Sequence, residues 1–429
     1  MRALDSEVKR AGLTQRDAGL ATEIVYGTLR VLPELDARIA PHVRRGLAET
    51  DGLTLAVLRA AAYQLWHLGR LPTHAIVHEA VGFIRTTRGR QNGGFVNAVL
   101  RRLAEQRPAE PTPADRVVLP EWLRRALVQS LGAERAAAFE APRGEAPPLC
   151  LAVAAQAREG LLEELTTALD SASADGEIAP GTLSPMAITV RRLGDLRRLA
   201  AYREGRFWVQ EEGAQLVALA VNPQPGERIA DLCAGHGGKT LCLASLLGGR
   251  GELTAVDIDE SKLDNLEREF ERLGLPVEML QCDAIDLSVG TGGLEPLYDR
   301  VLLDAPCTGV GTVLRRPELL LRLEEADPAR LAALQLAIAR NATQLVRNGG
   351  HLLVAVCSPL AEEGAALAAQ METQLPELRR VPAEIPGLDF PPDQDQILRI
   401  GPWMSKGASA PDGYQVIHFL VDRAGGCAS

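Results

Sequence analysis

The chain has 429 residues, of which 46% are hydrophobic and 24% are charged, as is typical of a globular protein with two or three domains. Its seven scattered cysteines include no Cys-x-x-Cys pair, which argues against both a disulfide framework and a zinc site. No apolar run approaches about 18 residues and the N-terminus lacks an apolar signal core. We therefore expect a cytoplasmic protein without a membrane partner.

The first part of the chain is predicted to be all-helical. Apolar residues recur at three- and four-residue steps in segments 16–43, 53–70, 73–87 and 93–106. We assign residues 1–107 to this helical domain and the proline-rich stretch 108–120 to a linker. His74, His78 and Glu79 have helical spacing that could suggest a metal site, but no third ligand is evident, so we expect no metal.

The basic residues are unevenly distributed along the chain. Residues 1–110 contain 16 Lys and Arg against 11 Asp and Glu, a balance of +5. Because the whole chain has a net charge of −10, residues 111–429 together carry −15. Local clusters occur at 85–90, 101–102, 191–198 and 315–316. Each cluster is either a solvated face or a surface that binds phosphate, and the sequence leaves both interpretations open.

A short mixed region occupies residues 120–210. Its patterns predict helices at 121–132 and 158–169 and strands at 147–155, 187–192 and 206–210. This alternation indicates a small α+β region between two larger domains.

The remainder, residues 211–425, alternates strand, tight loop and helix. Strands are predicted at 227–233, 252–259, 277–284, 299–306 and 351–358, and helices at 241–247, 262–274 and 329–350. This pattern is typical of the α/β class and predicts a Rossmann-like domain with a doubly wound, mostly parallel sheet. Ligands of such domains bind at the C-terminal ends of the strands.

A glycine-rich loop, "CAGHGGKT", joins the first of these strands to a helix. It lacks the first glycine of a phosphate-binding Walker loop, because Cys233 stands there, and it matches only two of the three glycines of the dinucleotide fingerprint. Its glycines still allow the backbone to approach a ligand at a helix N-terminus. Asp257 ends the next strand, where an acidic side chain would hydrogen-bond a ribose. We therefore predict a cofactor that contains a nucleoside.

Several segments, in this order and spacing, resemble the Sun (RsmB-type) ribosomal RNA cytosine-5 methyltransferases. They read "FWVQEEGAQLVA", "PQPGERIADLCAGHGGKT", "AVDID", "DRVLLDAPCTGVGTVLRR" and "GGHLLVAVCSPLAEE". The N-terminal helices resemble the NusB-like RNA-binding domain that precedes the catalytic domain in this family. The resemblance covers nearly the whole chain. It implies methyl transfer from S-adenosyl-L-methionine to carbon 5 of a cytosine in RNA, with 16S (small-subunit) rRNA as the expected substrate and a monomer as the expected state.

The resemblance also implies roles for two cysteines fifty residues apart, each at the end of a predicted strand. Carbon 5 of cytosine is a poor nucleophile, so a cysteine thiolate adds to carbon 6 and makes a covalent cysteine-cytosine intermediate. Cys357 would be this nucleophile, and Cys307 would assist loss of the proton from carbon 5 and release of the product. Asp304 would hydrogen-bond the cytosine edge.

The cofactor residues follow from the same resemblance. Asp257 would bind the ribose, Asp283 would lie beside the adenine, and Asp304 would border both substrates. The loop around the methionine moiety would consist of Cys233, Ala234, Gly235, His236, Gly237, Gly238 and Lys239.

The sequence departs from the family pattern at a few positions. Gly235 and His236 replace the usual Ala-Pro, Val356 replaces the threonine before the nucleophile, and Gly364 replaces an asparagine. Two alternative functions stay open: a non-catalytic or divergent RNA-binding paralogue acting on another RNA, and a nucleotide-dependent oxidoreductase. The presence of both cysteines with the lysine and aspartate of the motifs favours the methyltransferase.

Overall fold

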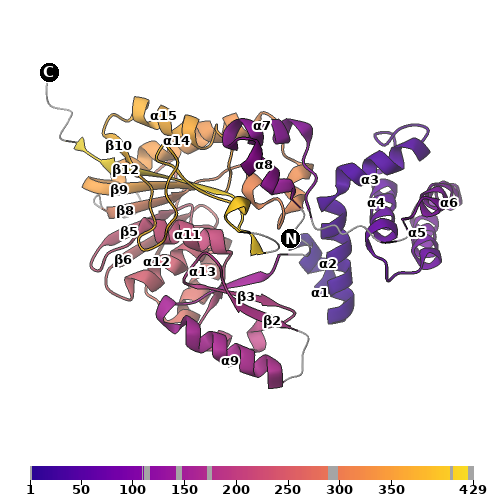
Figure 1. Cartoon of the computed structure of the whole chain (residues 1–429), viewed down its shortest axis with the longest axis horizontal. Helices are drawn as coiled ribbons and strands as arrows, with labels where there is room; N and C mark the ends of the chain where they lie inside the picture. The colour runs from indigo at the N-terminus through magenta and orange to yellow at the C-terminus, as the bar shows by residue number, and fades with distance from the viewer. Residues whose placement is uncertain are drawn as a thin grey trace. The chain divides into compact units, whose positions relative to one another are not determined.

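A computed structural model describes residues 2–108, 110, 116–141, 147–171, 176–287, 298–405 and 409–423. The chain divides into two compact units (Figure 1). The first unit comprises Met1–Arg124, Phe139–Ala146 and Val313–Arg322, and the second comprises Arg125–Ala138, Pro147–Thr312 and Leu323–Ser429. In the predicted linker, residues 109 and 111–115 lie outside the described residues.

The first unit begins with a bundle of helices, as predicted. The helices are α1 (Arg2–Arg10), α2 (Gln15–Arg30), α3 (Leu32–Ile39), η1 (Ala40–His42), α4 (Gly52–His67), α5 (Thr73–Arg88) and α6 (Arg90–Glu105). Two of them start at side-chain caps, because Thr14 accepts a hydrogen bond from Asp17 N and Asp51 accepts one from Thr54 N. The apolar faces of α2, α3, α4, α5 and α6 pack into one core around the buried Trp66.

The mixed region begins with two helices and continues with a small antiparallel sheet and the helices next to it. The helices are α7 (Glu121–Leu131) and α8 (Ala133–Glu140). The sheet has the order β2-β3-β1-β4, with β1 (Leu149–Ala152), β2 (Glu177–Pro180), β3 (Ala187–Arg191) and β4 (Trp208–Val209). Helix α9 (Arg158–Ser171) packs on this sheet through Leu161 and Leu165. A short helix, α10 (Ala200–Arg203), precedes β4.

The large sheet of the second unit has the order β10-β12-β9-β8-β5-β6-β7, and β11 pairs with β12. Its strands are β5 (Arg228–Leu232), β6 (Glu252–Asp257), β7 (Glu278–Gln281), β8 (Tyr298–Asp304), β9 (Val346–Val356), β10 (Leu378–Val381), β11 (Leu398–Ile400) and β12 (Tyr414–Val421). Strands β5 to β9 are parallel, whereas β12 runs antiparallel to β9. The predicted mostly parallel sheet is confirmed.

Helices cover both faces of this sheet (Figure 1). One face carries α11 (Glu212–Val221), α12 (Gly238–Leu247) and α13 (Glu260–Leu273), and the other carries α14 (Asp327–Leu345) and α15 (Ala365–Gln374). Successive strand residues point to opposite faces, so Ile229 packs in the first core and Ala230 in the second. Burial on both faces explains why these strands read as nearly continuous apolar runs.

The prediction that the helix from 329 extends to 350 is wrong. Helix α14 ends at Leu345, and Val346 already belongs to β9, where it pairs with Tyr298. Gly349 has a φ of +76°, which a right-handed helix does not accommodate. The structure also adds three strands beyond residue 358, where the sequence analysis assigns none. The remaining short turns are η2 (Ala155–Ala157), η3 (Leu196–Arg198), η5 (Val310–Thr312), η6 (Pro317–Leu321) and η7 (Pro402–Met404).

Candidate active site

The predicted site residues gather at one edge of the large sheet. Cys233 follows β5, Asp257 ends β6, Asp283 follows β7, Asp304 ends β8 and Cys357 follows β9. Because these five strands are parallel, their C-terminal ends meet at the same edge. Strand β5 has β6 on one side and β8 on the other, so its loop lies at the point where the chain switches direction across the sheet. Ligands of doubly wound sheets bind at this point.

A cavity of about 370 Å³ lies at this edge and is lined by Asp257, Asp283 and Asp304, together with Ile258 and Ile285. The two isoleucines are 60% and 46% exposed, which is unusual for large aliphatic side chains. They follow the ends of two neighbouring strands, so a flat apolar ring can insert between them. The cavity therefore fits an adenosine, with an apolar slot and carboxylates around it. The two isoleucines were not predicted as site residues, because nothing in their local sequence pattern indicates that they are exposed.

Asp257 joins the cofactor loop to the end of β6. Its Oδ2 accepts a hydrogen bond from Gly235 N at 2.7 Å, and its Oδ1 accepts one from Asp259 N at 2.9 Å. Lys262 Nζ lies 3.4 Å from Oδ1. A carboxylate has about four acceptor positions, so Asp257 retains capacity for ribose hydroxyl groups. Lys262 is a further residue at this site that the sequence analysis did not name.

The glycine-rich loop depends on a left-handed backbone. Cys233, Gly235 and Gly237 have φ values of +61°, +62° and +75°. A Cβ at Gly237 would lie 1.8 Å from a methyl carbon of Leu266, so only glycine fits there. Around these positions, Ala234 N donates to Val256 O, Gly238 begins α12, and His236 is exposed.

Lys239 and Asp304 form an ion pair between α12 and β8. Lys239 Nζ lies 2.8 Å from Asp304 Oδ2, and the lysine side chain is only 13% exposed. Burial opposes the lysine charge, but the Asp304 carboxylate outweighs it, with a smaller contribution from Cys357, and raises the pKa of Lys239. The ammonium group also lies 5.7 Å from the centre of the Tyr414 ring. This site therefore keeps one fixed positive charge near the thiols.

The two thiols come together although they lie fifty residues apart in the chain. Cys307 Sγ is 3.2 Å from Cys357 Sγ, and both side chains are partly exposed. The hydrogen bond to Cys357, followed by burial, holds the pKa of Cys307 well above its usual range. The two sulfurs share one hydrogen bond, in which either could be the donor, and the raised pKa keeps Cys307 neutral.

A buried carboxylate fixes the segment that contains Cys307. Thr308 donates to Glu363 from its backbone N at 2.9 Å and from its hydroxyl at 2.6 Å, and Gln335 Nε2 donates at 3.1 Å. Glu363 is fully buried, and burial raises its pKa. Glu363 ends the segment "GGHLLVAVCSPLAEE", but no role was predicted for it or for Gln335, because their shared contact joins segments far apart in the chain.

The structure gives one of the family departures a physical reason. A Cβ at Gly364 would lie 2.1 Å from Gln415 Oε1, so Gln415 already fills the space that a larger side chain would need. Gln415 Nε2 in turn donates to the backbone oxygens of Ser358 and Leu360 at 2.8 and 3.0 Å. The turn after Cys357 is therefore held by a side chain of β12.

A buried acid stands on β5, directly before the cofactor loop. Asp231 is 0% exposed, and its Oδ2 accepts a hydrogen bond from Thr240 Oγ1 at 2.6 Å. Its Oδ1 has no hydrogen-bond partner among the described residues. Burial raises the pKa of Asp231 from 3.8 to about 7, although the Thr240 bond acts in the opposite direction.

We expect Asp231→Asn to remove a pH dependence of stability. The folded state keeps a proton on Asp231 up to about pH 7, whereas the unfolded chain releases it near pH 3.8. The contribution of Asp231 to the free energy of unfolding therefore falls as the pH rises between these values. The unfolding free energy of Asp231→Asn, minus that of the wild type, should rise by up to about 1.4 kcal/mol per pH unit in this window. Denaturant titrations from pH 4 to 8 measure it. The exposed Asp264→Asn is the control, and equal curves for both variants would contradict the prediction.

No metal site or membrane span is found in the described parts of the chain. Within them, no group of three or more His, Cys, Asp or Glu side chains is placed to hold a metal ion. His74, His78 and Glu79 are exposed on α5. No described helix is long and apolar enough to cross a membrane.

A doubly wound sheet with a glycine-rich loop and carboxylates at successive strand ends is typical of enzymes that bind a nucleoside-containing cofactor, and the two thiols beside it are those that the resemblance to cytosine-5 methyltransferases implies. Residues 218–405 match the family described as 16S rRNA methyltransferase RsmB/F, and residues 1–105 match the NusB family. The Mycobacterium tuberculosis (strain H37Rv) protein Rv1407, provisionally named a methyltransferase, is 38% identical over 389 residues, which cover 85% of this chain and 81% of that protein.

A second relative also shows the family, and two solved structures share the fold. Ribosomal RNA small subunit methyltransferase B of Pseudomonas putida is 31% identical over 374 residues, covering 86% of this chain and 84% of its own. The crystal structure of PH0851 has a TM-score of 0.77 at 24% identity, covering 97% and 93% of the two chains. The structure of NSun6 from Pyrococcus horikoshii with SFG, an S-adenosylmethionine analogue, has a TM-score of 0.57 at 20% identity and covers 70% and 98%.

This chain belongs to the RsmB/F family of S-adenosylmethionine-dependent rRNA methyltransferases, enzymes that methylate carbon 5 of cytosine in RNA. The resemblance seen in the sequence, the enzyme class and the cofactor are thereby confirmed. The oxidoreductase alternative is wrong.

Proposed function

We propose that the protein methylates carbon 5 of a cytosine in small-subunit rRNA, in the cytoplasm, with Cys357 as the nucleophile. The observation that supports this most strongly is the 3.2 Å approach of two thiols from separate strand ends, next to a cavity that fits an adenosine. The small-subunit substrate is supported by the name of the Pseudomonas putida relative. A protein that only bound RNA would need neither thiol.

In the first step, the Cys357 thiolate adds to carbon 6 of the cytosine. The new sulfur–carbon bond shifts the electrons of the carbon 5–carbon 6 double bond onto carbon 5 and the ring. Asp304 would hydrogen-bond the cytosine edge, and Lys239, held 2.8 Å from Asp304, stabilises the negative charge in the site. S-adenosylmethionine supplies the methyl group that carbon 5 then takes.

Attack by Cys357 prepares Cys307 for the second step. The hydrogen bond between Cys307 and Cys357 is the largest cause of the high pKa of Cys307. When the Cys357 sulfur is bonded to carbon, it no longer bears a negative charge, so the pKa of Cys307 falls. Cys307 then releases its proton to water, and the resulting thiolate takes the proton from carbon 5. The electrons of that C–H bond re-form the double bond, and Cys357 leaves as a thiolate.

The proposed ribose contact predicts weaker cofactor binding in Asp257→Asn. Asparagine keeps the acceptor for Gly235 N but removes the charge and one acceptor for the ribose hydroxyls. We expect affinity for S-adenosylmethionine to fall by about 1–3 kcal/mol in calorimetry. Glu260→Ala, an exposed neighbour, should bind as the wild type does. Unchanged affinity in Asp257→Asn would remove Asp257 from the cofactor site.

The function itself is tested with S-adenosylmethionine labelled in its methyl group. The protein is incubated with small-subunit rRNA or large-subunit rRNA transcripts, and the digested nucleosides are separated. We expect labelled 5-methylcytidine only from the small-subunit transcript. Label in another nucleoside would contradict the reaction, and label only from the large-subunit transcript would contradict the substrate.

A further inference from the structure

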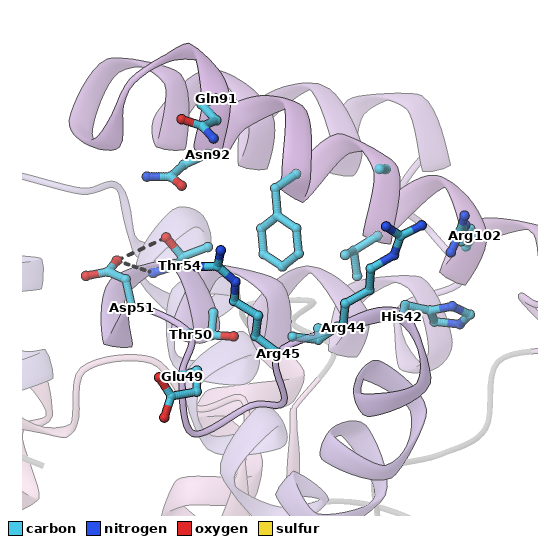
Figure 2. Close-up of a pocket in the computed structure, with 14 residues that line it drawn as sticks. His42, Arg44, Arg45, Glu49, Thr50, Asp51, Thr54, Gln91, Asn92 and Arg102 are labelled. Atoms are coloured by element: carbon cyan, nitrogen blue, oxygen red, sulfur yellow. Dashed lines mark hydrogen bonds between the residues drawn. The ribbon is translucent and has the colours of Figure 1, made fainter.

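The first unit contains a second cavity, of about 490 Å³, that the reaction described above does not use. It lies between helix α6 and the loop that follows η1 (Figure 2). Figure 2 shows Arg44 and Arg45 extending from this loop toward α6, which contributes Gln91, Asn92 and Arg102. The volume is in the range of small-molecule sites and is large enough for one nucleotide.

Three arginines of this cavity are not neutralised. Arg44, Arg45 and Arg102 are exposed, and none has an ion pair or hydrogen bond within the part of the chain that the structure describes. Elsewhere in the unit, in contrast, Arg59 pairs with Asp36 at 2.7 Å. Three unpaired guanidinium groups around a concave site, on a chain with a net charge of −10, indicate an anionic ligand. The planar guanidinium fork matches the geometry of a phosphate.

The charges also orient this ligand. Figure 2 shows Glu49 and Asp51 at the end of the cavity opposite His42 and Arg102. Asp51 is engaged, because it accepts from Thr54 N at 3.0 Å and pairs with Arg88 at 3.1 Å. Carboxylates repel phosphate, so the phosphate belongs at the Arg102 end. The opposite end offers carboxylate acceptors that suit the amino group of a base.

The cavity also has an apolar wall. Phe95 lines it and is partly exposed, while Val43 and Val99, which also line it, are buried. An aromatic face next to arginines is the combination with which proteins hold unpaired nucleotides, because a base stacks on the ring while its phosphate meets the cations. A base in a duplex is already stacked on its neighbours and cannot enter.

We propose that this cavity binds one nucleotide of a single-stranded segment of the RNA substrate. Its phosphate lies on Arg44 and Arg102, its base lies against Phe95, and Arg45, which Figure 2 places toward Asp51, adds positive charge to the cavity. The proposal rests on the proposed function, since it takes the occupant from the RNA that the enzyme methylates. It adds an anchoring site that is separate from the cytosine pocket.

The test uses the full-length protein with Arg44, Arg45 and Arg102 replaced together by alanine. The matched control replaces Arg16, Arg90 and Arg101, which are equally exposed and lie outside the cavity. Affinity for a small-subunit rRNA transcript is measured at several salt concentrations. We expect the cavity variant to lose about tenfold or more in affinity and its salt slope to fall by about 0.7, because one single-strand phosphate loses its cations. The control should stay within about twofold.

Kinetics and substitutions of the aromatic ring separate anchoring from general damage. The cavity variant should have a raised KM for RNA and an unchanged kcat at saturating RNA, because the catalytic residues are untouched. Phe95→Leu should lose about tenfold in RNA affinity, whereas Phe95→Trp, which retains a stacking surface, should bind as the wild type does. Equal loss in the cavity variant and the arginine control would overturn the proposal.

Failure of this proposal can be told apart from failure of the proposed function. If the wild type forms 5-methylcytidine and the cavity variant keeps wild-type RNA affinity, the cavity proposal is wrong. If the wild type forms no 5-methylcytidine, the proposed reaction is wrong. Selective loss of RNA affinity in the cavity variant would still support the RNA site.

Discussion

Alanine at Cys357 is expected to abolish both methyl transfer and every covalent protein–RNA adduct, whereas alanine at Cys307 should leave the protein joined to RNA. Cys357→Ala has no sulfur to add to carbon 6, so turnover should fall by roughly 10⁴-fold or more. Cys307→Ala retains the nucleophile and accepts the methyl group. It lacks the nearest base for the proton on carbon 5, because Cys307 Sγ lies 3.2 Å from the attacking sulfur.

A denaturing gel after incubation with small-subunit rRNA and labelled S-adenosylmethionine separates the two variants. The adduct should appear as a slow band in Cys307→Ala, disappear on nuclease treatment and contain the label. Cys242→Ala, which alters a buried thiol of α12, is the control and should turn over without the band. An adduct in Cys357→Ala but not in Cys307→Ala would reverse the two roles. Repeated turnover to free 5-methylcytidine by both variants would make both thiols structural.

Replacement of Glu363 by alanine is the second change from which we expect a large effect. It leaves the buried backbone N–H of Thr308 without its acceptor and leaves the Thr308 hydroxyl only Ser358 Oγ, 3.0 Å away. The free energy of unfolding should fall by about 2–5 kcal/mol. Because Thr308 follows Cys307 directly, the second thiol loses its fixed position, and release of the product should slow more than attack.

Glu363→Gln is the matched control for this prediction. Glutamine keeps the length of the side chain and one acceptor oxygen for Thr308 N, and the Thr308 hydroxyl can turn to Ser358 Oγ, 3.0 Å away. Stability should fall by less than half of the loss in Glu363→Ala. Denaturant unfolding and the fraction of protein trapped as adduct measure the two effects. Equal stability of the wild type and Glu363→Ala would contradict the role given to this carboxylate.

The parts of the fold that were predicted from the sequence are those with a strong local signal. The apolar runs that end at Asp257, Asp304 and Cys357 are central strands, whose burial on both faces leaves few polar residues. Their shared direction brings the strand ends together, so the positions of these site residues at one sheet edge followed from the alternation of strands and helices.

The features that were missed depend on contacts between distant segments. Strand β12 has a clear apolar pattern, but only its pairing with β9 shows that the sheet continues past the nucleophile. Glu363 acquires its importance from Thr308, 55 residues earlier, and Gln335, 28 residues earlier. In the sequence, Arg102 was noted only as half of a basic pair. Its neighbours in the cavity, Arg44 and Arg45, come from a loop far earlier in the chain, so the sequence does not show that the three arginines meet.

The most direct test of the central claim is to identify the residue that bears the RNA adduct. The slow band of Cys307→Ala is digested with nuclease and protease, and the peptides are analysed by mass spectrometry. If Cys357 is the nucleophile, we expect a methylated cytidine nucleotide on the peptide that contains Cys357, and on no other peptide. A nucleotide on another side chain, or 5-methylcytidine formed by Cys357→Ala at the wild-type rate, would contradict it.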